Sequence, residues 1–139
     1  MRRFVVSGLV PVDPVDLADH FLDPAAAPQI WPQIREQTPD AAPGGWWVCS
    51  VSSGDPEDAG EATVRLRRAS PVEIHERSAD GLTVHRFLAA SGGCLWTIES
   101  HARQRPSESW QHLCRRRERD RQRAMTLVDT AAGYFASLL

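Results

Sequence analysis

The sequence predicts an α+β protein in which an antiparallel β-sheet packs against one long C-terminal helix. Three observations support this fold class. The middle of the chain contains a series of short strand-like runs separated by Gly, Asp and Pro. Two Asp-Pro pairs follow the first such run and are typical of helix starts. The last segment carries apolar residues at helical spacing up to the C-terminus.

The elements follow from local signals. A first strand is predicted from Phe4 to Val10. Asp13 offers an N-cap before Pro14 and a short helix, and Asp23-Pro24 repeats this signal for a second short helix that ends near Trp31-Pro32. Strand-like runs then cover Gly45 to Ser53, Glu61 to Arg68, Pro71 to Ser78, Leu82 to Ala90 and Cys94 to Arg103, with Ile34 to Pro39 as a weaker candidate. The segment from Gly54 to Gly60 is interpreted as a hairpin loop, so we expect residues 1–139 to form a single domain.

The hairpin turns decide which side chains face inward. We interpret Ala79-Asp80-Gly81 and Ser91-Gly92-Gly93 as three-residue loops, which place Arg86 opposite Ile74 and Ile98. In this register one face is apolar with a polar centre, and we predict that it faces the interior: Val72, Ile74, Glu76, Leu82, Val84, Arg86, Leu88, Trp96, Ile98 and Ser100. The same alternation places Val64 and Leu66 inside. Alternation does not resolve the run from Gly45 to Ser53, where we choose Trp47, Cys49 and Val51 as the inward residues. His75 and His85 become neighbours on the solvated outer face.

The segment from a Pro106-Ser107 cap to the C-terminus is predicted to be one amphipathic helix. Its apolar stripe consists of Trp110, Leu113, Cys114, Ala124, Met125, Val128, Ala131, Ala132, Phe135 and Leu139. At about 100° per residue, Arg117 and Arg121 fall within roughly 20° of the centre of this stripe. A buried cation needs a partner, so we expect the helix to cover either internal carboxylates or a cavity that holds water or a polar ligand.

The composition excludes several function classes. With a formal net charge of -2, the protein as a whole does not attract nucleic acid or an anionic membrane. The 3 cysteines and 5 histidines lack the spacing of a disulfide framework or a metal site. No apolar run approaches the roughly 20 residues that span a bilayer. We therefore expect a cytoplasmic protein without metal or cofactor, and its lack of lysine suggests a GC-rich, bacterial genome.

A nucleic-acid surface is the alternative interpretation of the arginine-rich part of the last helix. Arg115, Arg119 and Arg123 share its outer face at a spacing that suits phosphates. Because Glu118 and Asp120 are interleaved with them, we favour a solvated surface with intrahelical ion pairs. The sequence also lacks a G-x-S-x-G signature and a phosphate-binding glycine loop at a helix start.

The segment from Val10 to Pro32 reads Val-Pro-x-Asp-Pro-Val, then Phe-Leu-Asp-Pro, then Ile-Trp-Pro. Together with the order of elements, this pattern resembles the SRPBCC or START-like superfamily, which includes polyketide aromatase/cyclases, plant pathogenesis-related and lipid-transfer proteins, and ring-hydroxylase subunits. The resemblance implies a helix-grip fold, with a curved sheet wrapped around the C-terminal helix and a deep apolar cavity between them. It also implies that Arg117 and Arg121 face Glu76 and Arg86. No catalytic motif of the family is matched residue by residue.

These observations lead to a predicted ligand site in the interior. We expect a small hydrophobic or aromatic molecule to contact Trp47, Leu66, Ile74, Glu76, Val84, Arg86, Leu88, Trp96, Ile98, Trp110, Leu113, Arg117 and Arg121. The arginines would hold a carboxylate, phenolate or enolate; the alternative is a Glu76 to Arg86 pair with the helix arginines reaching solvent. Trp31, Trp47, Trp96 and Trp110 either stack a planar ligand or pack the core.

The sequence leaves open whether the protein is an enzyme. If it catalyses a polyketide cyclase-like reaction, Glu76 is the expected proton shuttle. The alternative function is a non-enzymatic protein-interaction module with a filled core. As partners we expect the small ligand but neither nucleic acid nor membrane, and a homodimer stays open.

Overall fold

The computed structural model describes residues 2–52 and 60–139, so most of the predicted loop from Gly54 to Gly60 lies outside the described residues. The elements, in chain order, are β1 (Arg3–Val10), α1 (Pro14–Leu22), α2 (Ala27–Ile30), β2 (Ile34–Pro39), β3 (Trp47–Ser52), β4 (Glu61–Ser70), β5 (Glu73–Ser78), β6 (Gly81–Ala90), β7 (Gly93–Ala102) and α3 (Trp110–Ala136). The strands form one curved antiparallel sheet in the order β1-β7-β6-β5-β4-β3-β2. The predicted α+β class is confirmed.

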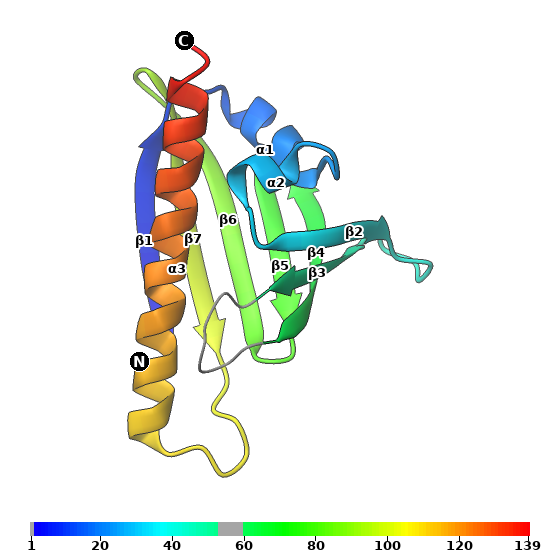
Figure 1. The fold of residues 1–139 in the computed structure, drawn as a ribbon, viewed down its shortest axis with the longest axis vertical. Helices are drawn as coiled ribbons and strands as arrows, with labels where there is room; N and C mark the ends of the chain where they lie inside the picture. Colours follow the sequence, from blue (N-terminus) through cyan, green and yellow to red (C-terminus); the bar gives the residue numbers. More distant parts are fainter. Residues whose placement is uncertain (1, 53–59) are drawn as a thin grey trace.

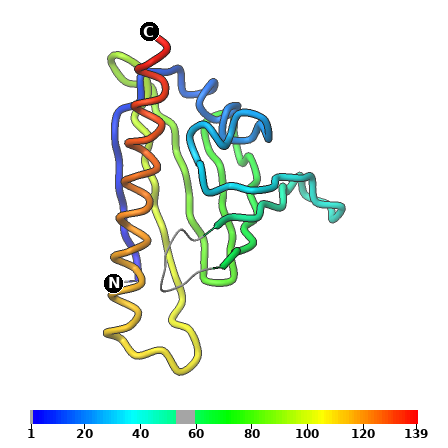
Figure 2. The backbone as a smooth tube through the Cα atoms, viewed as in Figure 1, coloured from blue at the N-terminus to red at the C-terminus, as the bar shows by residue number. Residues whose placement is uncertain are grey.

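The helices cover one face of the sheet unevenly (Figure 1). α3 packs chiefly against β1, which is an edge strand, and α1 and α2 lie at the end of the sheet next to the C-terminal half of α3. The backbone trace shows the same arrangement, with β2 to β5 curving away from α3 (Figure 2). This geometry leaves the inner face of the central strands covered by α1 at one end, where it packs on β6 and β7.

Capping residues set the ends of the helices. Asp13 Oδ1 accepts a hydrogen bond from the Val15 N–H at 2.9 Å and begins α1, as the sequence predicts. α3 begins later than predicted, because Ser109 Oγ accepts from the His112 N–H at 3.1 Å and serves as its N-cap. Ser107 precedes the helix with a φ of 63°, in the left-handed region. The 27-residue helix itself is confirmed.

The predicted hairpin register is wrong by one residue on both sides of β6. Ser78 pairs with Gly81 and Ala90 pairs with Gly93, so each loop has two residues. A Cβ on Gly81 would collide with the His101 carbonyl oxygen of β7, which is why a glycine serves as a strand residue there. A shift of one residue turns every side chain of a strand to the other face.

The correction changes the inner face of β6 but not those of its neighbours. Thr83, His85 and Phe87 face inward on β6, whereas Ile74 on β5 and Trp96 on β7 face inward as predicted. On β3 and β4, the residues expected inside are buried or packed against the core: Trp47, Cys49, Val51, Val64 and Leu66.

The packed core lies under α1. Phe21 meets Trp96 edge-on, with ring centroids 5.7 Å apart, and Phe87 lies 5.5 Å from Trp96. Further along the sheet, Gly8 of β1 lets α3 approach so closely that an added Cβ would lie 2.6 Å from Val128 Cγ1. The aromatic cluster holds α1 on β6 and β7, and the close approach at Gly8 holds α3 on β1 at one edge of the sheet.

Candidate ligand-binding cavity

A cavity of about 480 Å³ lies between α3, α2 and the inner face of the sheet. This volume falls within the range of about 300–1,000 Å³ that is typical of small-molecule sites. Its apolar lining includes Phe4, Ile30, Trp31, Val64, Ile98 and Leu127. Its polar lining includes Glu76, Thr83, His85, Ser100, Arg117 and Asp120. The cavity therefore has walls that can contact an apolar ligand. We call the part lined by Glu76, Thr83, Ser100 and Arg117 its polar end, although further polar side chains such as Gln33 and Thr126 line other parts.

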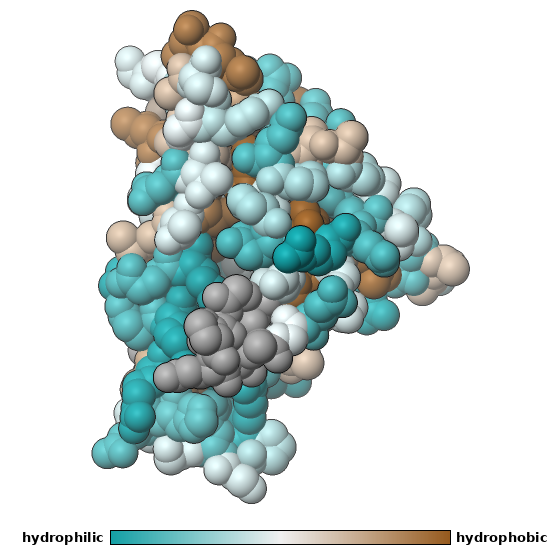
Figure 3. Space-filling view, in the orientation of Figure 1, coloured by the Kyte–Doolittle hydropathy of each residue, from teal (hydrophilic) through white to brown (hydrophobic). Residues whose placement is uncertain are grey.

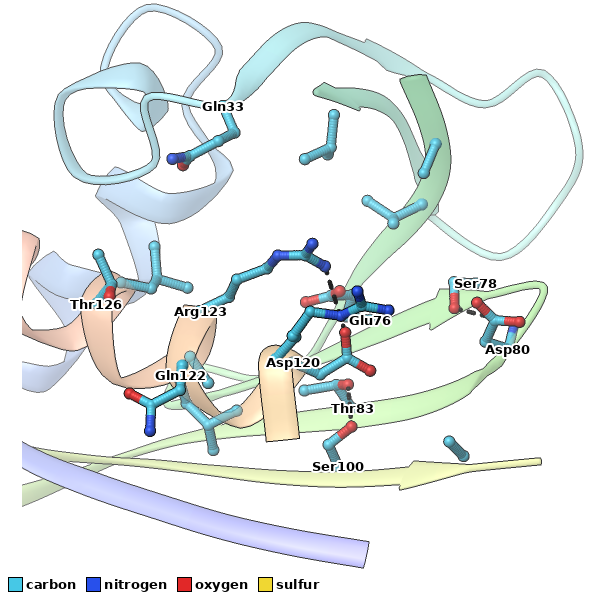
Figure 4. A pocket seen from close by; sticks show the side chains of 18 of the residues that line it. Gln33, Glu76, Ser78, Asp80, Thr83, Ser100, Asp120, Gln122, Arg123 and Thr126 are labelled. Carbon is cyan, nitrogen blue, oxygen red and sulfur yellow. Dashed lines mark hydrogen bonds and ion pairs between the residues drawn. The ribbon is translucent and has the colours of Figure 1, made fainter. Parts of the chain in front are cut away.

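The polar end is built from one row of side chains across the sheet. Glu76 of β5 pairs with Thr83 of β6, and Thr83 pairs with Ser100 of β7. We call these three residues the polar row. In Figure 4 they rise from the sheet towards Asp120 and Arg123 of α3. Directly paired residues in a sheet have Cβ atoms about 4.5–5.5 Å apart, so one small polar group can contact neighbouring members of the row.

Arg117 reaches the end of the polar row from α3. Its Nη2 donates to Ser100 Oγ at 2.8 Å and its Nη1 donates to Asp120 Oδ2 at 2.9 Å. The guanidinium carbon lies 4.7 Å from the centre of the Phe4 ring, which places the cation over the aromatic face. The side chain is 5% exposed. Arg117 therefore points inward, as the helical periodicity predicts, and a carboxylate one turn later balances its charge.

His85 connects the aromatic core to Glu76. The indole Nε1–H of Trp96 donates to His85 Nδ1 at 3.2 Å, and His85 Nε2 lies 2.8 Å from Glu76 Oε1. Because an indole nitrogen can only donate, Nδ1 must accept, and the imidazole proton is on Nε2. His85 therefore donates to Glu76 and holds one carboxylate oxygen in place. The other oxygen, Oε2, has no hydrogen-bond partner within residues 2–52 and 60–139.

Two ion pairs tie the segment between β7 and α3 to the end of the cavity. Arg116 donates to both oxygens of Glu108, at 2.9 Å each, and these side chains are 6% and 4% exposed. The bonds from Arg116 lower the pKa of Glu108 to about 2. Arg105 donates to both oxygens of Asp80, at 2.9 and 2.7 Å, and lowers the pKa of that carboxyl. These pairs fix the start of α3 over the sheet.

The predicted ligand-binding residues separate into three groups. The first lines the cavity and consists of Glu76, Ile98 and Arg117. The second is buried in the interior or packs against the core and is not part of the cavity lining: Trp47, Leu66, Ile74, Trp96 and Leu113. The third lies away from the cavity and consists of Val84, Arg86, Leu88, Trp110 and Arg121.

The predicted register places Arg86 and its neighbours on the wrong face of β6. Arg86 lies on the outer face, where it donates to Glu73 and Glu99 at 3.0 Å each. The proposed pair between Arg86 and Glu76 is therefore wrong. Leu88 is 47% exposed on the same outer face, and Val84 is buried there. The acidic partners raise the pKa of Arg86, Glu99 most strongly.

The arginine-rich part of α3 also differs from expectation. Arg121 pairs with Glu118 at 2.7 Å and its side chain is 33% exposed, so it does not face the interior as predicted. Trp110 is 55% exposed at the start of the helix. Arg119 and Arg123, expected on the outer face, contribute to the cavity lining. The surface over this half of α3 is strongly hydrophilic, in contrast to the apolar C-terminal end (Figure 3).

Sequence reasoning missed three functional candidates, Thr83, His85 and Asp120. The one-residue error in the register of β6 placed Thr83 and His85 on the outer face of the sheet. Asp120 was interpreted as part of a solvated surface, although it follows Arg117 by three residues, the spacing at which opposite charges pair on a helix. The i,i+3 spacing of Arg117 and Asp120 could have predicted their ion pair.

The histidines lie elsewhere than the sequence suggested. His75 pairs with Val84, whereas His85 faces the interior and is 1% exposed, so the two are not neighbours on the outer face. Among residues 2–52 and 60–139, no three His, Cys, Asp or Glu side chains are grouped to hold a metal ion. Over the same described ranges, no helix combines the length and apolar character needed to cross a membrane.

No family model matches the chain, and no curated protein matches its sequence. Solved structures match its fold. Protein NE0264 from Nitrosomonas europaea is 13% identical with a TM-score of 0.69 and covers 97% of this chain and 94% of that chain. The di-domain ARO/CYC StfQ from the steffimycin biosynthetic pathway is 10% identical with a TM-score of 0.74 and covers 98% of this chain and 51% of that chain. Ara h 8.0201 is 14% identical with a TM-score of 0.61, covering 97% of each chain.

The chain has the START-like (SRPBCC) fold. The helix-grip arrangement implied by the sequence resemblance is thereby confirmed. Such low identities concern the fold alone, because one fold supports many functions. The chemistry of this chain therefore depends on the residues of its own cavity.

Proposed function

We propose that the protein binds a small hydrophobic or aromatic molecule in the cavity between the sheet and α3. The observation that carries this proposal is the cavity of about 480 Å³ with apolar walls and one polar end. Val64, Ile98 and Leu127 supply apolar contacts from the sheet and the helix, and Glu76 lies at the polar end. The fold shared with StfQ, an ARO/CYC of a biosynthetic pathway, supports binding of a small molecule.

A polyketide cyclase-like activity is the finer form of this proposal. It draws on StfQ, which is an ARO/CYC of a biosynthetic pathway and has a similar fold. In such a reaction Glu76 would accept and return a proton, since His85 orients it and its second oxygen is available. Arg117, at the end of the polar row, would stabilise negative charge that develops on a ligand oxygen.

Binding of a neutral aromatic probe tests the proposal. Trp31 lines the cavity, so 2-methoxynaphthalene should quench tryptophan fluorescence saturably. Val64→Phe adds bulk to the cavity wall and should weaken binding at least tenfold. Val5→Phe adds the same bulk at a residue of the outer face that is 51% exposed and should leave the affinity unchanged. The absence of saturable binding, or equal effects of both variants, would contradict the proposal.

Native mass spectrometry of the purified protein gives a second, independent test. A copurifying small molecule that is lost in Val64→Phe would support ligand binding in the cavity and would identify its mass. A cytoplasmic location stays a prediction from the sequence.

One observation favours the alternative, a protein-interaction module. Leu9 pairs with Leu95, and Leu95 pairs with Leu88, so three leucines form a row across the outer face of β1, β7 and β6. We call this the outer leucine row; Leu9 and Leu88 are 63% and 47% exposed. If it joins two copies of the chain, light scattering should give a dimer mass for the wild type and a monomer mass for Leu95→Asp. A monomer at all concentrations would contradict this alternative.

A further inference from the structure

The hydroxyl groups of the polar row carry one unused hydrogen. Thr83 Oγ1 and Ser100 Oγ are 3.1 Å apart, so one donates to the other. Ser100 Oγ also accepts from Arg117 Nη2. Whichever hydroxyl donates, the hydrogen of the other has no acceptor in the part of the chain that the structure describes. Both residues line the cavity, so this pair offers it one O–H donor.

Glu76 carries the complementary unused acceptor. Its Oε1 is occupied by the N–H of His85, and its Oε2 has no partner among residues 2–52 and 60–139. The side chain is 20% exposed and lines the cavity. Glu76 and Thr83 are directly paired across β5 and β6, so the acceptor and the hydroxyl pair are neighbours. A ligand group that both donates and accepts can therefore bond to the Glu76 oxygen and to the hydroxyl pair at once.

The carboxylate of Glu76 disfavours an anion beside the polar row, although arginines line other parts of the cavity. Arg117 is the most deeply buried cation of the lining, and Asp120 already pairs with it at 2.9 Å. Arg123 approaches the other oxygen of Asp120 at 3.4 Å. Within the described residues, the polar contact of Glu76 is to His85, whose Nδ1 accepts from Trp96 and whose Nε2 donates to Glu76. A ligand carboxylate placed here would face the negative charge of Glu76 at short range.

We infer that the polar end of the cavity recognises a neutral hydroxyl group, of a phenol or an alcohol, and discriminates against a carboxylate. The ligand hydroxyl donates to Glu76 Oε2 and accepts from the Thr83 and Ser100 pair, while its apolar body contacts the cavity walls. His85 acts as a positioning residue that keeps Glu76 directed at the hydroxyl, and Trp96 fixes the imidazole tautomer. This inference rests on the proposed function, because it names the head group of a ligand of the same cavity.

Three naphthalenes of similar size test the inference by isothermal titration calorimetry at neutral pH. 2-Naphthol can donate and accept, 2-methoxynaphthalene can only accept, and 2-naphthoate is an anion. The wild type should bind 2-naphthol tenfold or more tighter than 2-methoxynaphthalene, the factor expected for a hydrogen bond to a charged acceptor. It should bind 2-naphthoate most weakly.

The variant Glu76→Gln tests whether Glu76 causes the preference for 2-naphthol over the other two naphthalenes. The new amide can still accept from His85 but presents N–H donors to the cavity. The preference for 2-naphthol over 2-methoxynaphthalene should fall below threefold, and the affinity for 2-naphthoate should rise at least fivefold. The matched control is Glu73→Gln on the same strand, whose side chain pairs with His75 and Arg86 on the outer face and should leave all three affinities unchanged.

The outcomes separate this inference from the proposed function. If none of the naphthalenes binds, ligand binding in the cavity fails and the inference fails with it. If 2-methoxynaphthalene binds as tightly as 2-naphthol, or 2-naphthoate binds most tightly, the cavity binds ligands but the hydroxyl inference is overturned. Should Glu76→Gln not fold, Thr83→Val removes one hydroxyl of the pair. Because both 2-naphthol and 2-methoxynaphthalene accept from this pair, that variant should weaken each of them about threefold, and an unchanged affinity for 2-naphthol would overturn the inference.

Discussion

Replacing Gly8 with alanine should destabilise the protein, although alanine is normally the better residue in a strand. The new Cβ would lie 2.6 Å from Val128 Cγ1, where α3 packs on β1. Either α3 moves away from the sheet or Val128 adopts a poorer rotamer. Overpacking of this kind costs about 1–3 kcal/mol. At about 4 °C per kcal/mol for a chain of this size, Tm should fall by about 4–12 °C.

Thermal unfolding followed by circular dichroism measures this effect. Val128→Ala removes the clashing methyl group, so the double variant should lose about 1 kcal/mol less than the sum of the single changes. Gly133→Ala is the matched control, because Gly133 lies on the exposed side of α3 with no atom within 4 Å of an added Cβ, and it should gain up to about 1 kcal/mol. A Gly8→Ala variant as stable as the wild type, or strictly additive with Val128→Ala, would refute the close packing of α3 on β1.

Further predictions concern protonation and thiol reactivity. Because Arg116 lowers the pKa of Glu108 from 4.5 to about 2, Glu108 stabilises the fold above pH 4.5 and this contribution is lost as the pH falls towards 2. Glu108→Gln should flatten the pH dependence of the unfolding free energy over that interval; an unchanged slope would contradict the ion pair. Burial raises the pKa of the Cys49 and Cys94 thiols to about 12 and 11, so at about pH 8 native protein should react rapidly with a disulfide reagent through Cys114 alone. Two or more rapidly reacting thiols would contradict the burial.

The elements of the fold could be predicted because their signals are local. Asp13 caps α1 as expected, and the weaker strand candidate from Ile34 to Pro39 has the predicted bounds. The inward position of Arg117 followed from helical periodicity. These features depend on neighbours within a few residues, which the sequence displays directly.

The inner face of β6 could not be predicted because both faces of this strand carry apolar residues. Val84 and Leu88 made one face appear internal, whereas Phe87 and His85 belong to the true inner face. Val84 is buried even on the outer face. The choice depends on Gly81, which occupies a strand position next to the His101 carbonyl of β7, a contact between strands that alternation does not reveal.

The depth of each arginine in α3 depends on how the helix meets the sheet. Because α3 packs chiefly on the single strand β1, its buried stripe is narrow and Arg121 falls outside it. Arg116 is buried instead, because Glu108 in the preceding segment folds back onto it. Neither contact is encoded in the helical period. The site therefore differs from the predicted one mainly in its polar partners, since Glu76 contacts His85 instead of Arg86.

Intermolecular NOEs in the complex with 2-naphthol test the central claim most directly. If the ligand occupies the cavity, its ring protons should show NOEs to methyl groups of Val64, Ile98 and Leu127, which line the cavity from the sheet and from α3. NOEs confined to the outer leucine row, or a complex without NOEs to these three residues, would contradict binding between the sheet and the helix.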